Sequence, residues 1–237
     1  MAAPVHLSVV VPCFNEEGRL PEALNHAIAY LDDRGDAYEL ILVDDGSSDR
    51  TLEIMRAAAA SRDCVRVVAI MPNQGKGHAL AAGVSVSAGY EVLVSDCDFS
   101  TPITELPKLE RALAAGAELA IASRARRGSR VEVSQPIYRV LMGKVFNLIV
   151  QAVLLPGVWD TQCGFKLFRG DLARDLFARI HTQGFGYDIE VLYLARRGGH
   201  RLAEVPVRWI NSTPTKVAAF KHSLEMFLDI FRVRAGR

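Results

Sequence analysis

The sequence predicts an α/β fold whose core is a doubly wound, mostly parallel sheet flanked by helices. Strand-like apolar runs alternate with helical stretches from residue 7 onward, and strands joined through such helices form right-handed parallel crossovers. Val92, Leu93 and Val94 are apolar in succession, as expected of a strand covered on both faces. The chain has 237 residues, of which 50% are hydrophobic and 23% charged, so we expect one large domain over residues 1–237.

Local patterning predicts each element in turn. Strands are expected where β-branched and other apolar residues run together, and helices where apolar residues recur at helical spacing. The expected strands cover residues 7–11, 39–43, 65–70, 91–94 and 119–123. The expected helices cover residues 20–31, 51–60, 78 to about 88, 138–155 and about 217–234. No repeat or low-complexity linker interrupts this order, which again indicates a single domain.

Bulk charge and composition exclude several classes of protein. The formal net charge of +1 argues against a general nucleic-acid binder, which would carry a marked basic excess. The four cysteines have no metal-ligand spacing, so a reducing compartment such as the cytoplasm is expected. No signal peptide is visible, and the most hydrophobic stretch, residues 140–159, is broken by polar residues and a proline. We therefore expect no nucleic-acid partner and a cytoplasmic location.

Two carboxylates one residue apart follow the central apolar run. Asp96 and Asp98 come just after the strand expected at 91–94, and ligands of open α/β sheets bind outside the carboxyl ends of the strands. Two such carboxylates can share a hard cation with the phosphates of a substrate. The alternative is a pair of turn aspartates before a helix that starts with Pro102 in its first position.

The loops after the first three strands have distinctive compositions. Residues 12–17 follow the first strand, 44–49 the second and 72–78 the third. The Asp, Gly and Ser residues of the second loop are equally typical of a tight turn before a capped helix. Glycines on both sides of Lys76 suggest a backbone that cradles phosphate. Residues 70–77 lack the P-loop pattern, and no G-x-G-x-x-G follows the first strand, so a P-loop ATPase and a dinucleotide dehydrogenase are excluded.

These motifs, in this order, resemble the family 2 inverting glycosyltransferases with the GT-A fold. The resemblance rests on residues 10–16, 43–49, 73–77 and 96–98. The dolichyl-phosphate glucosyltransferase branch, close to the dolichyl-phosphate mannose synthases, is resembled at residues 98–103, 159–168 and 186–190. The resemblance covers about residues 9–209. It implies a single GT-A domain with a nucleotide-binding half at about 5–100, an acceptor half at about 101–210 and a C-terminal amphipathic helix.

The resemblance implies a donor site for a nucleotide-diphosphate sugar. Asp45 would accept a hydrogen bond from the base, while Asp96 and Asp98 would bind the ribose and a Mg²⁺ or Mn²⁺ ion bridging the diphosphate. That ion would stabilise the negative charge of the departing nucleotide. Lys76 would add positive charge near the phosphates, and a solvated loop lysine is the alternative. The wall around the base and the ribose would consist of Pro12, Phe14 and Glu16.

The resemblance also implies an acceptor site for the phosphate of a polyprenyl lipid. Arg124 and Arg139 lie where that phosphate is expected, and arginine offers a planar fork that suits a phosphate group. The sequence does not decide whether Arg126 and Arg127 also bind this phosphate or lie on a solvated face.

Asp98 and Asp160 are the expected catalytic residues, Asp98 through the metal ion. A hydroxyl acceptor must lose its proton during attack, and Asp160 would then be the general base. A phosphate monoester needs no base, because its second pKa is about 6 and it is largely dianionic at neutral pH. With a phosphate acceptor, Asp160 would instead align the arginines or the sugar. The alternative for Asp160 is a cap of the turn at Thr161.

Two amphipathic stretches have two interpretations each. Residues 138–155 carry a broad apolar face, and an aromatic stripe near the C-terminus contains Phe220, Leu224, Phe227 and Phe231. Both patterns are typical of a helix docked on its own protein and also of a helix that lies on a bilayer surface. The resembled branch uses a lipid acceptor and often carries a membrane anchor, which is not visible in this sequence. Peripheral contact with the cytoplasmic face of a membrane is the corresponding expectation.

We expect a metal-dependent inverting hexosyltransferase that moves glucose from UDP-glucose to a polyprenyl or dolichyl phosphate. The alternatives among enzymes are a GDP-mannose donor and a soluble hydroxyl acceptor. A sugar-nucleotide binding protein without transfer activity is the non-enzyme alternative, and the intact set of Asp96, Asp98 and Asp160 speaks against it. A nucleotidyltransferase is disfavoured because its glycine-rich basic signature is absent after the first strand.

Overall fold

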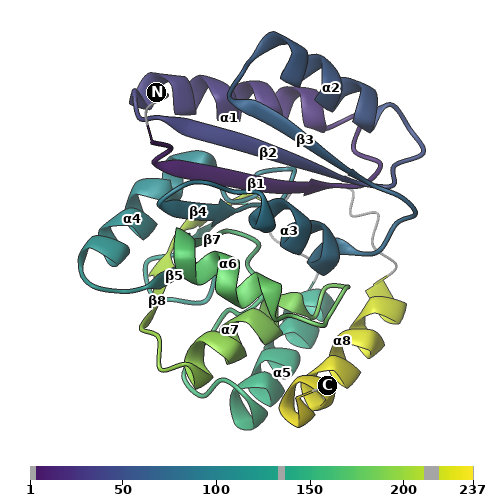
Figure 1. Ribbon diagram of the computed structural model, residues 1–237. Helices are drawn as coiled ribbons and strands as arrows, with labels where there is room; N and C mark the ends of the chain where they lie inside the picture. The colour runs from purple at the N-terminus through teal and green to yellow at the C-terminus, as the bar shows by residue number, and fades with distance from the viewer. Residues whose placement is uncertain (1–3, 133–136, 211–218, 237) are drawn as a thin grey trace.

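A seven-stranded sheet in the order β3-β2-β1-β4-β7-β5-β8 forms the centre of the protein (Figure 1). The computed structural model describes residues 4–132, 137–210 and 219–236, and the side chains of these residues apart from 137–140 and 219–224. Every pairing in the sheet is parallel except those of β7, which runs antiparallel to β4 and to β5. The predicted mostly parallel sheet is therefore confirmed.

The strands are short, and most are buried. Those of the main sheet are β1 (Leu7–Cys13), β2 (Tyr38–Asp45), β3 (Val65–Ile70), β4 (Glu91–Val94), β5 (Leu119–Ser123), β7 (Lys166–Arg169) and β8 (Leu202–Pro206). A small second sheet pairs β6 (Arg130–Val131) in parallel with β9 (Arg208–Trp209). Four of these strands, β6, β7, β8 and β9, were not predicted from the sequence.

Helices cover both faces of the main sheet, so the prediction of a doubly wound fold is confirmed as well. One core lies under α1, α2 and α4, and a second core lies under α3, α5, α6, α7 and α8 (Figure 1). Successive residues of β1 serve the two cores alternately, with Val9 and Val11 in the first and Val10 in the second. The helices are α1 (Leu20–Arg34), α2 (Thr51–Ser61), α3 (Lys76–Ser85), α4 (Leu106–Ala114), α5 (Ile137–Val153), α6 (Gly170–Ala178), α7 (Tyr187–Arg197) and α8 (Ala219–Ala235).

The helix after the Asp96–Asp98 turn begins later than predicted. Pro102 has an extended backbone conformation and precedes a 3₁₀ turn, η1 (Ile103–Glu105). Helix α4 starts at Leu106 and has its proline, Pro107, in the first turn. The alternative interpretation had a helix that starts with Pro102, and this start was wrong, because the chain first makes the 3₁₀ turn and α4 carries its own proline, Pro107, as its second residue.

The C-terminal helix α8 is docked on the protein. Its residues Asp229, Ile230 and Val233 are buried, and it packs against α5 and α7. Its other side leaves Phe227 and Phe231 exposed, with the two rings in edge contact at 5.4 Å. Within the described ranges, no helix is long and apolar enough to cross a membrane. Helix α8 therefore packs on the protein through one side and exposes apolar side chains on another.

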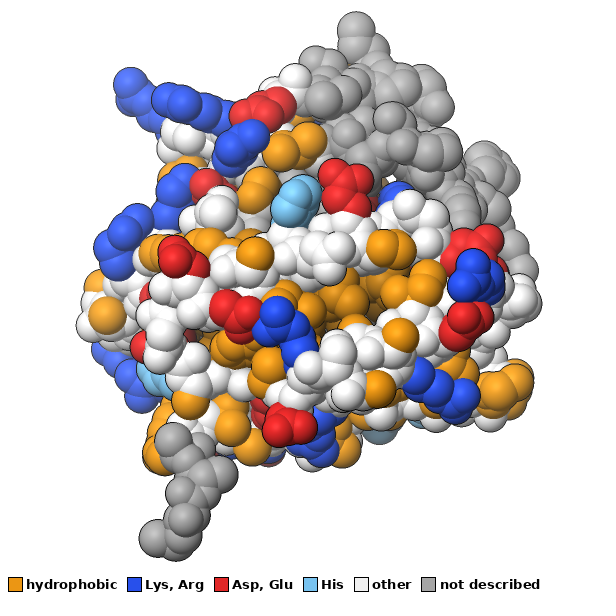
Figure 2. Space-filling model, turned by 90° about the horizontal axis from the view of Figure 1, so that it is seen from above, with side chains coloured by type: hydrophobic (Ala, Val, Ile, Leu, Met, Phe, Trp, Pro, Cys, Tyr) orange, Lys and Arg blue, Asp and Glu red, His pale blue; other side chains and the backbone are white. Residues whose placement is uncertain are grey.

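Charged side chains of both signs are interspersed on the face that Figure 2 presents, with hydrophobic side chains visible near its centre. Ion pairs at the surface of α1 and beside α2 join Arg62 to Asp32 at 2.6 Å and Arg50 to Glu53 at 3.0 Å. Such exposed pairs contribute little to stability.

Candidate active site

The carboxyl ends of β1, β2 and β4 meet at one edge of the sheet, because these strands are parallel neighbours. Phe14 and Glu16 follow β1, Asp45 ends β2, and Asp96 and Asp98 follow β4. The fold thus brings predicted donor residues from three separate loops to the edge at which ligands of open α/β sheets bind.

Asp96 forms an ion pair with Lys76, the first residue of α3. The ammonium group of Lys76 also lies 5.6 Å from the ring centre of Tyr187 and 5.8 Å from that of Phe185. Burial opposes ionisation of Asp96, but the nearby cation of Lys76 and two further cations hold the pKa of Asp96 below its ordinary value. Lys76 keeps only 20% of its side chain exposed, so it is not a solvated loop lysine.

Asp98 lies beside an arginine that the sequence analysis did not select. Arg19, directly before α1, places Nη1 3.5 Å from Oδ2 of Asp98, and its Nε donates to Oε2 of Glu16 at 2.7 Å. The backbone N–H of Ser100 donates to Oδ1 of Asp98 at 3.0 Å. Arg19 therefore links Glu16 to Asp98. Its position between a strand end and a helix was the only signal in the sequence.

Asp45 holds the turn at residues 73–75. Oδ2 accepts hydrogen bonds from Nδ2 of Asn73 and from the backbone N–H of Gly75, both at 2.8 Å. Oδ1 accepts one bond, from the backbone N–H of Gln74 at 2.9 Å. A carboxylate offers roughly four lone-pair sites, so Oδ1 keeps capacity for one further donor. That capacity is what the predicted hydrogen bond from a nucleobase requires.

The glycines around Lys76 make room for another loop. The backbone N–H of Gly77 donates to the carbonyl oxygen of Gln183 at 2.6 Å. A Cβ on Gly75 would lie 2.6 Å from the same oxygen, and a Cβ on Gly77 would overlap the carbonyl oxygen of Thr182. The backbone at the start of α3 is therefore engaged by the loop before α7. The interpretation of these glycines as a phosphate cradle was wrong, and the positive charge here comes from Lys76.

Asp160 binds Arg124 through three hydrogen bonds. The backbone N–H and Nε of Arg124 donate to Oδ2, and Nη2 donates to Oδ1, each at 2.8 Å. Trp209 lies against the guanidinium group, with its ring centre 5.3 Å from the guanidinium carbon. Burial disfavours the charge of Asp160, but the cation of Arg124 holds the pKa of Asp160 below its ordinary value. Asp160 is therefore ionised, and it orients Arg124.

A buried ion pair behind this edge was missed by the sequence analysis. Lys166 of β7 pairs with Asp188 of α7, with side-chain exposures of 0% and 6%, and also donates to the carbonyl oxygen of Cys163 at 2.6 Å. Removing either partner would leave a buried charge, so the pair fixes β7 to α7. Both residues lie within the motifs 159–168 and 186–190. The available signal was a single lysine inside an apolar run.

The remaining predicted residues differ in exposure. Phe14 is 46% exposed, whereas Pro12 is buried within β1. Arg126 and Arg127 are exposed. Arg139 belongs to α5, but its side chain lies outside the described residues.

Comparison with known proteins identifies the family. The family model described as "Glycosyl transferase family 2" matches residues 8–177. The chain belongs to glycosyl transferase family 2. Among its curated relatives is the dolichyl-phosphate beta-glucosyltransferase of Homo sapiens, 34% identical over 241 residues that cover 96% of this chain and 74% of the relative. The dolichyl-phosphate beta-glucosyltransferase of Saccharomyces cerevisiae is 29% identical over 97% of this chain and 74% of its own length.

Solved structures of similar fold include glucosyl-3-phosphoglycerate synthase from Mycobacterium tuberculosis in complex with UDP. Its TM-score is 0.71 at 23% identity, over 98% of this chain and 80% of that chain. A complex of the same synthase with Mn²⁺, UDP and phosphoglyceric acid has a TM-score of 0.70 at 22% identity, over 97% of this chain and 78% of that chain. The predicted GT-A fold of a family 2 glycosyltransferase is thereby confirmed.

The carboxylates of this family 2 glycosyltransferase fit a divalent metal ion. Asp96 and Asp98 supply hard oxygen ligands, and 38% and 18% of their side chains are exposed. Mg²⁺ is commonly held by one or two carboxylates together with substrate phosphates. Within the described part of the chain, no group of three or more His, Cys, Asp or Glu residues could hold a metal by itself. The donor set therefore suits an ion whose coordination a diphosphate completes.

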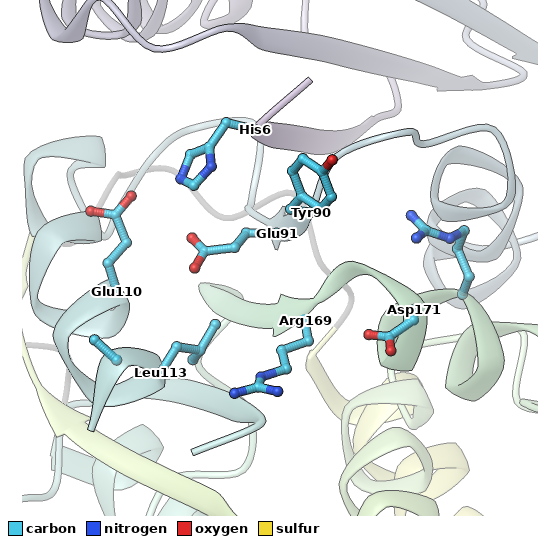
Figure 3. A pocket seen from close by; sticks show the side chains of 9 residues that line it. His6, Tyr90, Glu91, Glu110, Leu113, Arg169 and Asp171 are labelled. Carbon is cyan, nitrogen blue, oxygen red and sulfur yellow. The ribbon is translucent and has the colours of Figure 1, made fainter. Parts of the chain in front are cut away.

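A cavity of about 630 Å³ lies at the opposite edge of the sheet (Figure 3). It is lined by His6 just before β1, Glu91 at the start of β4 and Arg169 at the end of the antiparallel β7. Burial and the nearby carboxylate of Glu110 raise the pKa of Glu91 above its ordinary value. None of the predicted donor or acceptor residues lines this cavity. We place the active site at the carboxyl edge, where the ligand sites of such sheets lie.

Proposed function

We propose that this protein transfers glucose from UDP-glucose to a polyprenyl phosphate such as dolichyl phosphate, with inversion at the anomeric carbon. Membership of glycosyl transferase family 2 supports the reaction class, and 34% identity to a dolichyl-phosphate beta-glucosyltransferase over 96% of the chain supports the substrates. The observation that carries the proposal is the position of the Arg124 guanidinium group. Asp160 orients this group close enough to Asp96 for the two charges to interact.

On the donor side, carboxylates and Lys76 would meet the diphosphate. Asp96 and Asp98 would hold Mg²⁺ or Mn²⁺, and the bound ion would supply positive charge to the departing UDP. Lys76 already pairs with Asp96, so its ammonium group can reach the same phosphates. Asp45 keeps one acceptor site for an N–H of the uracil base. The exposed ring of Phe14 can cover that base.

On the acceptor side, a phosphate needs cations rather than a base. Because its second pKa is about 6, it attacks the anomeric carbon as a dianion and loses no proton, while the bond from that carbon to the UDP oxygen breaks. Arg124 would offset the repulsion between the acceptor phosphate and the donor diphosphate, and Arg139 is proposed as a second cation. A general base works best with a pKa near the operating pH. Asp160 has a lowered pKa and is bonded to Arg124, so we assign it to orientation.

A lipid acceptor requires contact with a membrane surface, for which two adjacent helices offer apolar side chains. Those on α5 are each at least 46% exposed: Leu141, Met142, Val145 and Leu148. Those on α8 are Phe227, Leu228 and Phe231, and the last turn of α8 adds Arg232 and Arg234. Large apolar side chains beside arginines suit a bilayer with anionic headgroups. We propose that α5 and α8 bind peripherally to the membrane that carries the acceptor.

The test of the reaction is turnover of a panel of nucleotide sugars with Mn²⁺ and a short-chain polyprenyl phosphate. We expect the highest kcat/KM with UDP-glucose and the phosphate acceptor. A preference for GDP-mannose would refute the proposed donor. Equal use of the neutral polyprenol would refute the proposed acceptor.

The test of the metal site is Asp98→Asn. We expect calorimetric titration of this variant with UDP to lose its dependence on Mn²⁺, and turnover to fall by a factor on the order of 10²–10³, as for loss of a group that stabilises developing charge. Asp33→Asn, an exposed change on α1, is the matched control and should alter neither quantity. An unchanged Mn²⁺ titration in Asp98→Asn would remove the metal role of this residue.

A further inference from the structure

We propose that Trp209 is a positioning residue for the acceptor phosphate and acts through Arg124. The inference rests on the proposed acceptor site and adds to it an aromatic surface that fixes the direction of the guanidinium group. Trp209 is 8% exposed, and its ring centre lies 5.3 Å from the guanidinium carbon of Arg124. A cation over the face of an aromatic ring is attracted by the ring quadrupole, and tryptophan is the strongest such partner.

Arg124 presents only part of its guanidinium group to a ligand. Its Nε and Nη2 atoms donate to Asp160, and the indole of Trp209 lies against the group. A guanidinium group carries more N–H donors than these two bonds use, in one plane. The side chain of Arg124 keeps 30% of its surface exposed, so it is open to a ligand on part of its surface. The carboxylate fixes one edge of the plane and the indole restrains its tilt, and together they set the direction from which a phosphate is bound.

Trp209 is itself held by the backbone on two sides. The N–H of Glu132, directly after β6, donates to the carbonyl oxygen of Trp209 at 3.0 Å. The N–H of the next residue, Ile210, donates to the carbonyl oxygen of Ser100 at 2.7 Å, and Ser100 in turn donates to Asp98. The backbone that carries the indole is therefore tied to the turn that carries the proposed metal ligand. This link keeps Arg124 in a fixed relation to the donor phosphates.

If Trp209 only filled space, its substitution would change stability and substrate binding in a different way. Its loss would lower stability and would weaken donor and acceptor binding alike. A tryptophan that directs Arg124 should instead affect the acceptor KM selectively. The aromatic face, rather than the volume of the side chain, should decide the effect.

The experiment compares Trp209→Leu with Trp209→Phe. We measure thermal unfolding, kcat, the KM for UDP-glucose and the KM for a short-chain polyprenyl phosphate. Trp209→Leu should raise the acceptor KM about tenfold and leave the donor KM within about twofold, whereas Trp209→Phe, which keeps a ring, should recover most of the difference. The matched control is Tyr193→Leu, which removes another arginine contact, with Arg197 at 5.8 Å on α7, and should not change the acceptor KM.

A double-mutant cycle with Arg124→Ala separates the possible failures. If Trp209 acts through Arg124, Trp209→Leu should not raise the acceptor KM further once Arg124 is absent. If Arg124→Ala raises the acceptor KM while Trp209→Leu and Trp209→Phe leave it unchanged, this inference is overturned and the proposed acceptor site stands. If Arg124→Ala itself leaves the acceptor KM unchanged, both the inference about Trp209 and the proposed acceptor site are refuted. Should Trp209→Leu not fold, Trp209→Phe decides: a small rise confined to the acceptor KM supports the inference, whereas an unchanged acceptor KM, or an equal rise of the donor and acceptor KM, overturns it.

Discussion

Replacing Asp160 by asparagine leaves Arg124 without its charged partner. Asp160 is 7% exposed and accepts three hydrogen bonds from Arg124, so Asp160→Asn keeps the shape of the side chain but removes a buried charge. Breaking a buried ion pair costs about 3–5 kcal/mol. Since Arg124 keeps 30% of its side chain exposed, water compensates part of this cost, and we expect the free energy of unfolding to fall by about 2–3 kcal/mol at neutral pH.

The difference between wild type and Asp160→Asn should depend on pH. Arg124 holds the pKa of Asp160 in the folded protein below the value of about 3.9 for an unfolded aspartate. The stabilisation is therefore complete above about pH 4 and is lost as the pH falls through the lowered pKa of the folded state. Urea unfolding at a series of pH values should show the two free energies of unfolding converging in acid.

Asp175→Asn is the matched control for this experiment. Asp175 of α6 pairs with Arg179, directly after the helix, at 2.9 Å, and both side chains are more than half exposed, at 57% and 52%. Water screens such a pair, so its loss should have little effect. The reasoning is refuted if Asp160→Asn costs no more than Asp175→Asn at neutral pH, or if the cost of Asp160→Asn persists unchanged into acid.

Turnover against pH tests the role of the same residue in the reaction. If Asp160 orients Arg124, Asp160→Asn should lower the rate and keep the acidic limb of the wild-type profile, because that limb then reports ionisation of the acceptor phosphate and no proton passes to Asp160. Arg139→Ala should raise the acceptor KM strongly. If the neutral polyprenol proved as good an acceptor as the phosphate, and Asp160→Asn were inactive at every pH, Asp160 would be a general base and the lipid-phosphate acceptor would be wrong.

Other substitutions probe the donor site, the packing and the membrane surface. Asp45→Ala should weaken uridine and UDP by similar free energies in calorimetric titrations, since Asp45 is proposed to bind the base; a loss confined to UDP-glucose would assign it to the sugar. Gly77→Ala should cost about 1–3 kcal/mol in urea unfolding because its Cβ would overlap the carbonyl oxygen of Thr182, whereas Gly18→Ala meets open space; equal stabilities would contradict this packing. Phe231→Asp should reduce co-sedimentation with anionic vesicles and spare turnover of a short-chain acceptor, and unchanged sedimentation would place the membrane contact elsewhere.

The meeting of the donor residues could be predicted because it follows from local patterns and one topological rule. The strands at 65–70 and 91–94 have the predicted bounds, since their apolar runs end abruptly at polar loops. Parallel strands place their carboxyl ends at a common edge. Asp45, Asp96 and Asp98 were therefore expected at one edge without knowledge of the strand order.

Contacts between distant segments could not be predicted in the same way. Arg19 can be recognised as a site residue only once the position of Asp98 is known. Trp209 can be recognised only once the pairing of β6 with β9, two strands of two residues each, is known. Lys166 stands out in the sequence, but its partner Asp188 depends on how α7 packs against β7. The glycines beside Lys76 show the same limit, because the loop that fills the space around them comes from residues 182–184.

Gln183 joins the loop before α7 to the start of α3 through its carbonyl oxygen. Every amino acid carries that oxygen, so an exchange of the side chain at position 183 leaves the joint intact. Any larger residue at position 75 or 77 forces the two backbones apart. Natural variation should therefore be wide at position 183 and narrow at the two glycines. A gene that encodes this joint can diversify the side chains of the loop without loosening the place where α3 and α7 meet.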